Sequence, residues 1–216
     1  MRGYGCAMAI RAVAFDVNET LFSLGPVAAQ LPEGGLPLVF ARVLRDGFAL
    51  ALTGDVPAMG ALFAAHASAI GGDGGSALAA FRELDPYPDV RPALERLRDA
   101  GLAVATLTNG AVELSAANLD RAGLADLVAL RLAAQDGGRW KPAPEPYRYA
   151  AEQLGVRLPE LALVAVHSWD VHGATRAGAV AGYCTRLEGG LVDGFAEPAV
   201  TGDDLVEVVE GLLALP

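Results

Sequence analysis

Short apolar runs alternate along most of the chain with stretches in which apolar residues recur at helical spacing. Apolar runs of about four to eight residues are typical of strands buried in a parallel sheet. Strands that alternate with helices predict βαβ units. The expected strands are 10–15, 102–107, 127–132, 161–166 and 180–184, and the expected helices between and after them are 90–100, 112–122, 145–154 and 203–215.

One segment, residues 25–85, does not follow this alternation. It is rich in Ala and Leu, and glycine- and aspartate-containing breaks divide it into helical stretches. The expected helices are 38–52, 56–70 and 77–84. We therefore predict an α/β fold with a mainly parallel, Rossmann-like core formed by residues 8–24 and 86–216, and a helical cap of residues 25–85 inserted after the first strand.

Composition narrows the class of protein. With 216 residues, 53% of them hydrophobic, the chain can bury a sizeable core. The formal net charge of −10 argues against nucleic acid and membrane surfaces as partners. No apolar run is long enough to span a bilayer. Cys6 and Cys184 are too few to indicate a disulfide framework, so we expect reduced thiols and a cytoplasmic protein.

Polar residues that are capable of catalysis or ligand binding follow four of the expected strands. Active sites of open α/β sheets lie at the carboxyl ends of the strands. Asp16 ends the first strand, and a carboxylate held there can act as a nucleophile that forms an ester. Thr108 and Asn109 end the second strand, where hydroxyl and amide groups suit an anion. Each position taken alone also fits an ordinary turn residue.

The remaining two strand ends carry a cation and a second acid. Lys141 stands before three prolines that stiffen its loop, and an ammonium near Asp16 would keep that carboxylate ionised. Asp170 would prepare a water molecule while Asp16 attacks. His167 suits a general base or a hydrogen-bond donor. A solvated lysine and a histidine with a structural partner are the plainer alternatives.

These residues lie in four motifs, AFDVNETLF, LTNG, WKPAPEPY and HSWDVHGA. Over nearly its whole length the chain resembles the haloacid dehalogenase superfamily, within it the type II L-2-haloacid dehalogenases. The resemblance implies a Rossmann-like core with a helical cap, Asp16 as the nucleophile, Lys141 as its ion-pair partner and Asp170 as the residue that activates water. It further implies roles for Thr20 and Thr108 in holding nucleophile or substrate, Asn109 in the leaving-group pocket, Tyr147 in supporting the site, and Arg42, in preference to Arg45, in receiving the departing halide.

Asn18 distinguishes between branches of that superfamily. Its phosphatases usually carry a second aspartate two positions after the nucleophile, which protonates the leaving oxygen. An amide cannot do so, whereas a halide leaves without a proton, so Asn18 favours displacement at carbon. We count Asn18, Tyr147 and His167 among the substrate-contacting residues. The sequence differs from the dehalogenase motifs at Asn18, Glu19, Ala165 and His167. These differences leave open which group departs from the carbon.

The sequence thus predicts a hydrolase in which Asp16 displaces a substituent from the α-carbon of a small anionic organic acid. The scheme requires no cofactor and no metal. Three alternatives stay open: a Mg²⁺-dependent phosphatase with Asp16 and Asp170 as metal ligands, a hydrolase of a non-halogenated activated carbon, and a binding protein on a scaffold that has lost catalysis. A homodimer is plausible from the small residues of the cap.

Overall fold

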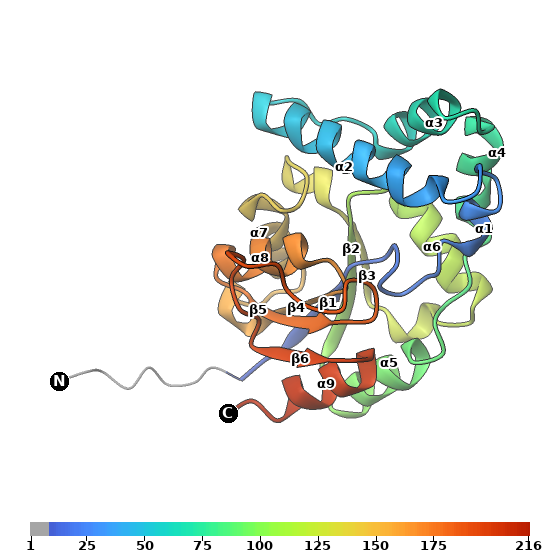
Figure 1. The fold of residues 1–216 in the computed structure, drawn as a ribbon. Coiled ribbons are helices and arrows are strands. Elements are labelled where there is room, and N and C mark those ends of the chain that lie inside the picture. Colours follow the sequence, from blue (N-terminus) through green and yellow to red (C-terminus); the bar gives the residue numbers. More distant parts are fainter. Residues whose placement is uncertain (1–8) are drawn as a thin grey trace.

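The protein is a six-stranded, fully parallel sheet with helices on both faces and a group of helices above its carboxyl edge (Figure 1). The computed structural model describes residues 9–216, so Cys6 and Met8 lie outside the described residues. The strand order is β3-β2-β1-β4-β5-β6. The strands are β1 (Ala12–Phe15), β2 (Ala103–Thr108), β3 (Leu130–Ala133), β4 (Leu161–Ala165), β5 (Val180–Cys184) and β6 (Val200–Gly202).

The order of the strands places β1 at the centre of the sheet. The chain adds β2 and β3 on one side of β1 and then crosses to add β4, β5 and β6 on the other. Phe15, the last residue of β1, pairs with Thr106 of β2 and with Val164 of β4. Parallel α/β sheets bind ligands at such a reversal of strand order, outside the carboxyl ends of the strands.

Helices bury the two faces of the sheet. The side chains of β1 alternate, so that Val13 and Phe15 join one apolar cluster while Ala12 and Ala14 join the other. Helices α5 (Val90–Asp99) and α9 (Leu205–Leu213) cover the first face, and α7 (Pro144–Gln153) and α8 (Ser168–Ala177) cover the second (Figure 1). Helix α6 (Val112–Arg121) follows β2.

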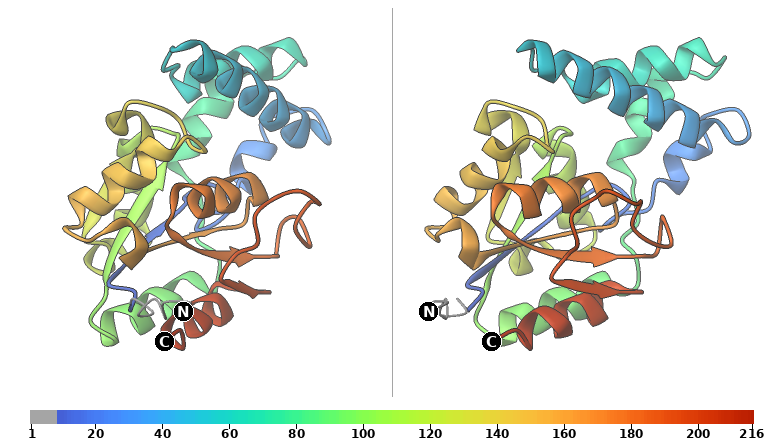
Figure 2. Two further views of the ribbon diagram at one scale, coloured as in Figure 1. Left: turned by 90° about the vertical axis from the view of Figure 1, so that its left-hand side faces the viewer. Right: turned by 60° about the vertical axis from the view of Figure 1, so that its left-hand side comes forward.

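The segment that interrupts the alternation is helical, as expected. It forms α1 (Gly25–Ala28), α2 (Gly35–Thr53), α3 (Met59–Ala69), α4 (Gly74–Ala79) and the short 3-10 turn η1 (Ala80–Arg82). These helices stand together above the carboxyl edge of the sheet, with α2 and α3 side by side (Figure 2). The predicted fold class is confirmed, while the domain boundaries at residues 24 and 86 stay a prediction.

Several details differ from the sequence expectation, among them the short helix α1, which was not predicted. The third strand lies at Leu130–Ala133 rather than 127–132, because Ala125–Leu127 forms a 3-10 turn, η2, that buries Leu127 before the strand begins. The edge strand β6 and helix α8 were not predicted. Strand β6 has only three residues, and the polar residues of HSWD mask the start of α8. No helix among residues 9–216 is long and apolar enough to cross a membrane.

Candidate active site

Asp16 lies at the carboxyl end of β1 with its side chain almost completely buried. The hydroxyl of Thr20 donates a hydrogen bond to Asp16 Oδ2 over 2.9 Å, and the backbone N–H of Val166 donates to the same hydroxyl over 3.2 Å. Thr20 therefore ties the carboxylate to the end of β4. This fixed position at the centre of the sheet suits an attacking group.

Lys141 joins the two predicted acids. Its ammonium, fully buried, donates to Asp16 Oδ1 over 2.9 Å and to Asp170 Oδ2 over 2.5 Å. Burial alone would lower the pKa of Lys141, but the charges of the two carboxylates outweigh it and raise the pKa. The lysine is therefore a permanent cation, as a buried ammonium between two carboxylates must be.

The same contacts set opposite pKa shifts on the two acids. Burial would raise the pKa of Asp16, yet Lys141 and then His167 outweigh it and hold the pKa far below its ordinary value. Burial raises the pKa of Asp170, and the negative charge of Asp16 adds to the rise despite the ion pair with Lys141. Divergent pKa values on neighbouring carboxyl groups are typical of sites in which one acid attacks and the other exchanges a proton.

Tyr147 forms a hydrogen bond with Asp170. Its phenol donates to Asp170 Oδ1 over 2.7 Å, and burial, followed by the charge of Asp170, raises its pKa well above the ordinary value. Tyr147 is completely buried in α7 and lines neither of the cavities described below. It positions the second acid, whereas the sequence placed it with the substrate-contacting residues.

His167 brings a second cation to the nucleophile. Its Nδ1 lies 3.4 Å from Asp16 Oδ2, an ion-pair distance without hydrogen-bond alignment, and its Nε2 lies 3.0 Å from Glu19 Oε2. Burial would lower the pKa of His167, but the carboxylates of Asp16 and Glu19 raise it to about 10. The imidazole is therefore protonated at neutral pH.

Glu19 is a functional candidate that the sequence missed. Its backbone has φ +63°, in the left-handed region that costs a residue with a side chain about 1–2 kcal/mol. That conformation accompanies the contact between Glu19 and His167. A glutamate in a turn after a strand gives no sequence signal of its own, because only the fold brings residues 19 and 167 together.

The other predicted residues line the opening above Asp16. Thr108 Oγ1 accepts a hydrogen bond from the N–H of Gly110 over 2.9 Å, which leaves the hydroxyl proton free to face a substrate. Asn18 and Thr108 line two adjoining cavities. Asn109 lines the smaller of them, and both Nδ2 and Oδ1 of its side chain form hydrogen bonds with the backbone of Lys141. Asn109 thus both borders the opening and fixes the lysine.

The smaller cavity lies directly over the nucleophile. Its volume of about 20 Å³ leaves room for about one water-sized group. The cap contributes only apolar side chains to it, and Trp169 closes it beside His167, with the two rings stacked at 5.4 Å between centroids. Its lining is Asp16, Asn18, Phe40, Leu44, Met59, Thr108, Asn109, His167 and Trp169.

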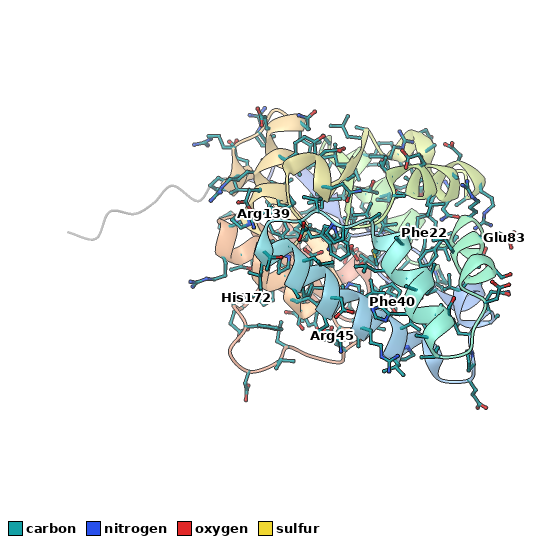
Figure 3. All side chains as sticks on the ribbon, turned by 90° about the horizontal axis from the view of Figure 1, so that it is seen from above. Phe22, Phe40, Arg45, Glu83, Arg139 and His172 are labelled. Carbon is teal, nitrogen blue, oxygen red and sulfur yellow. The ribbon has the colours of Figure 1, made fainter. Side chains whose placement is uncertain are left out.

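The structure does not bring the predicted cap arginines to this cavity. Arg42 and Arg45 both belong to α2 but line neither cavity, and Arg45 is exposed and paired with Asp46 over 2.6 Å (Figure 3). The helix instead directs Phe40 and Leu44 to the site, since residues four apart share one helix face. An apolar face of a cap helix looks the same in sequence whether it covers a core or a site.

The two acids of the site hold a cation of the protein itself between them. Within residues 9–216 no group of three His, Cys, Asp or Glu side chains could hold a metal ion. Lys141 occupies the position between Asp16 and Asp170 where a cation shared by both carboxylates would lie. The ammonium thus already supplies these two carboxylates with the positive charge that a shared Mg²⁺ ion would bring.

Fold and site together define an α/β protein with a helical layer above its sheet and an ionised aspartate, flanked by cations, at the end of its central strand. Residues 10–178 match the family model of haloacid dehalogenase-like hydrolases. The chain belongs to that family, as the motifs had indicated.

Two curated relatives match part of the chain. One is (S)-2-haloacid dehalogenase 4A of Burkholderia cepacia, 38% identical over 101 residues, or 47% of this chain and 44% of that protein. The other is phosphatase MT3486 of Mycobacterium tuberculosis, 49% identical over 71 residues, or 32% of this chain and 33% of that protein. The chain therefore spans less than half the length of these relatives.

A solved structure resembles the whole fold. The crystal structure of a dehalogenase has a TM-score of 0.85 and 27% sequence identity, and the comparison covers 93% of this chain and 96% of that one. A TM-score at this level over nearly the whole length places the same sheet and the same helical layer in both proteins.

Proposed function

We propose that the protein hydrolyses 2-substituted carboxylic acids, with halide as the leaving group, through an ester on Asp16. One observation carries this proposal: the Asp16 carboxylate lies under a cavity with Lys141 on one oxygen and His167 beside the other. Both cations keep it ionised, and an ionised carboxylate is the nucleophilic form. The dehalogenase names among the relatives and the resembling structure support the same reaction.

In the first step an oxygen of Asp16 attacks the α-carbon, and the carbon–halogen bond breaks with its electron pair on the halide. Attack from the back inverts the carbon. The charge of Asp16 passes to the leaving anion on the far side of the α-carbon. We assign to the His167 imidazolium, 3.4 Å from Asp16 Oδ2, the part of keeping the nucleophile ionised, while the cap offers Phe40 and Leu44 rather than Arg42 to the departing halide. Thr108 is the proposed donor to the substrate carboxylate.

In the second step water attacks the carbonyl carbon of the ester, and the hydroxy acid leaves with an oxygen that came from Asp16. Ester formation removes the charge of Asp16, so Lys141 then pairs with Asp170 alone. Asp170, held by Lys141 and Tyr147, is the proposed acceptor of the water proton. Asn18 accords with this scheme because the halide needs no proton.

Free halide released from L- and D-2-chloropropionate in the presence of EDTA tests the proposal. We expect release from one enantiomer, and a fall of about 10⁴-fold or more in Asp16→Asn. Phosphate release from small phosphate esters that requires Mg²⁺, with no halide release, would support the phosphatase alternative. Turnover of non-halogenated electrophiles alone would support the hydrolase of a non-halogenated activated carbon. No turnover of any of these compounds would support a binding protein.

The proposal also covers cofactor, compartment and assembly. We propose that the reaction needs no cofactor. Cys184 is a buried free thiol, which accords with a reducing cytoplasm. The homodimer stays a prediction, and light scattering would test it.

A further inference from the structure

A second, much larger cavity adjoins the one above Asp16. Its volume is about 610 Å³, within the range of about 300–1,000 Å³ typical of sites for drug-sized ligands. Asn18, Met59 and Thr108 line both cavities, so the large one opens from the position of the reacting carbon. A two- or three-carbon acid would occupy only a small part of this space.

Cap and core each supply one wall of the large cavity. Helices α3 and α4 and the turn η1 form the cap wall, which stands over α6 of the core (Figure 2). Large apolar side chains line both walls: Met59, Phe63, Leu78 and Phe81 from the cap side, Val17 and Leu114 from the core. Such a surface binds hydrocarbon groups and offers few hydrogen-bond partners to a polar chain.

The charged residues of the lining lie away from the nucleophile. Arg82 and Glu113 both line the cavity and are exposed to solvent, whereas Met59 and Phe63 are buried. The interior is therefore mainly apolar, with Ser115 and Asn118 as buried polar exceptions, and the charged side chains are exposed to water. An apolar group on the substrate would lie along the walls, with its carboxylate near Thr108.

We infer that the substrate of the proposed reaction carries an extended apolar group, a medium-length alkyl chain, on the carbon that Asp16 attacks, and that this chain lies in the large cavity. The inference rests on the proposed function and narrows its substrate class. The small haloacids named above are then minimal substrates that reach Asp16 but leave the cavity empty.

Bromide release from 2-bromopropionate, 2-bromohexanoate and 2-bromooctanoate tests the inference. Each methylene buried in the cavity should lower KM by about fourfold. The predicted result is a stepwise fall in KM along the series with little change in kcat. A KM that is flat or rises with chain length, while 2-bromopropionate is still turned over, would overturn the inference and leave the proposed function intact.

A variant in the cavity wall makes the test specific. Ala61 of α3 lines the cavity and is exposed, so Ala61→Phe narrows the space without disturbing a buried position. Ala65→Phe, one turn later on α3 and outside the lining, is the matched control. We expect Ala61→Phe to erase most of the preference of kcat/KM for the octanoate over the propionate, and Ala65→Phe to keep it. An unchanged preference in Ala61→Phe would place the chain elsewhere.

Binding separates failure of the inference from failure of the proposed function. Calorimetry with Asp16→Asn would compare unreactive propionate and octanoate. Tighter binding of octanoate, by about fourfold per added methylene and weakened in Ala61→Phe, supports the apolar subsite even if no bromo acid is turned over. Equal binding of the two acids contradicts it.

Discussion

The side-chain amide of Asn109 forms a reciprocal pair of hydrogen bonds with the backbone of Lys141. Nδ2 of Asn109 donates to the carbonyl oxygen over 3.1 Å, and Oδ1 accepts from the backbone N–H over 2.9 Å. The end of β2 thereby fixes the loop that carries the lysine. We expect Asn109→Ala to lower the free energy of unfolding by about 1–3 kcal/mol, because it leaves two buried backbone groups unpaired.

Activity should suffer more than stability in that variant, since a displaced ammonium no longer lies on both carboxylates. Urea denaturation and steady-state kinetics at a temperature where the variant is folded would check both effects. Asn118→Ala is a suitable control for turnover of 2-bromopropionate, because its amide bonds Phe81 and Leu84 in the same manner and it lines only the large cavity, which this small acid leaves empty. Equal losses of kcat in the two variants would contradict a positioning role for Asn109.

Lys141→Met should be strongly destabilising at neutral pH. It leaves Asp16 and Asp170 buried without their cation, and removing one partner of a buried ion pair costs about 3–5 kcal/mol. Arg139→Met, two residues earlier, removes a half-exposed cation that lies 3.7 Å from Glu145 and donates to the Ala51 carbonyl, and it should cost only about 1–2 kcal/mol because the Gly54 N–H still bonds that carbonyl.

The loss of folding stability in Lys141→Met should depend on pH. Without the ammonium, burial and mutual repulsion raise the pKa of the two carboxyl groups above the unfolded value. Protons bound in the folded state stabilise it below those pKa values, and this stability is lost as pH rises through them. Denaturation at pH 5 should therefore show a smaller deficit than at pH 8. A deficit that grows on acidification would show that the carboxylates are not the source.

His167 should set the alkaline limit of the reaction. Its pKa is raised from 6.5 to about 10, so the imidazolium and the stability it contributes are fully present below pH 6.5 and are lost as pH rises through 10. We expect kcat/KM to stay level across neutral pH and to fall near pH 10. Glu19→Gln should move that fall to lower pH, because one of the two carboxylates is gone.

His167→Asn should remove the alkaline fall and lower kcat at all pH values. A fall near pH 6.5 in the natural protein would mean that the histidine is not held as a cation. A fall near pH 10 that persists in His167→Asn would assign the fall to a group other than His167.

Gly173 has to be glycine for the site to close. A Cβ there would lie 2.5 Å from Cβ of Pro142 and 2.6 Å from the hydroxyl of Tyr147. We expect Gly173→Ala to cost about 1–3 kcal/mol and to loosen the contact between Tyr147 and Asp170. Thermal denaturation beside Gly190→Ala, where a Cβ meets open space, would check it. Equal melting temperatures would contradict this packing.

The strand ends were predictable because the pattern that fixes a parallel sheet also fixes where its carboxyl edge lies. Asp16, Thr108, Lys141 and Asp170 each follow an apolar run, and the fold brings these runs to one edge. Local pattern could not place β3 to the residue, since Leu127 and Val128 are as apolar and as buried as the strand that follows.

The residues that the cap contributes to the site could not be predicted from the sequence. Nothing local indicates that α2 directs Phe40 and Leu44 rather than Arg42 toward Asp16, because the rotation of the helix depends on its packing against α3. Glu19 was missed for a related reason: its partner His167 is 148 positions away. Contacts between distant residues emerge from the tertiary structure alone.

A single turnover in H₂¹⁸O, with protein in excess over 2-bromopropionate, shows whether Asp16 forms the ester. Water that attacks the ester carbonyl leaves its oxygen on the aspartate, and the hydroxy acid carries the unlabelled oxygen of the original carboxylate. Mass spectrometry should then find ¹⁸O in the peptide that contains Asp16 and none in the product. Label in the product and an unlabelled peptide would contradict the covalent mechanism and indicate direct attack of water on the substrate.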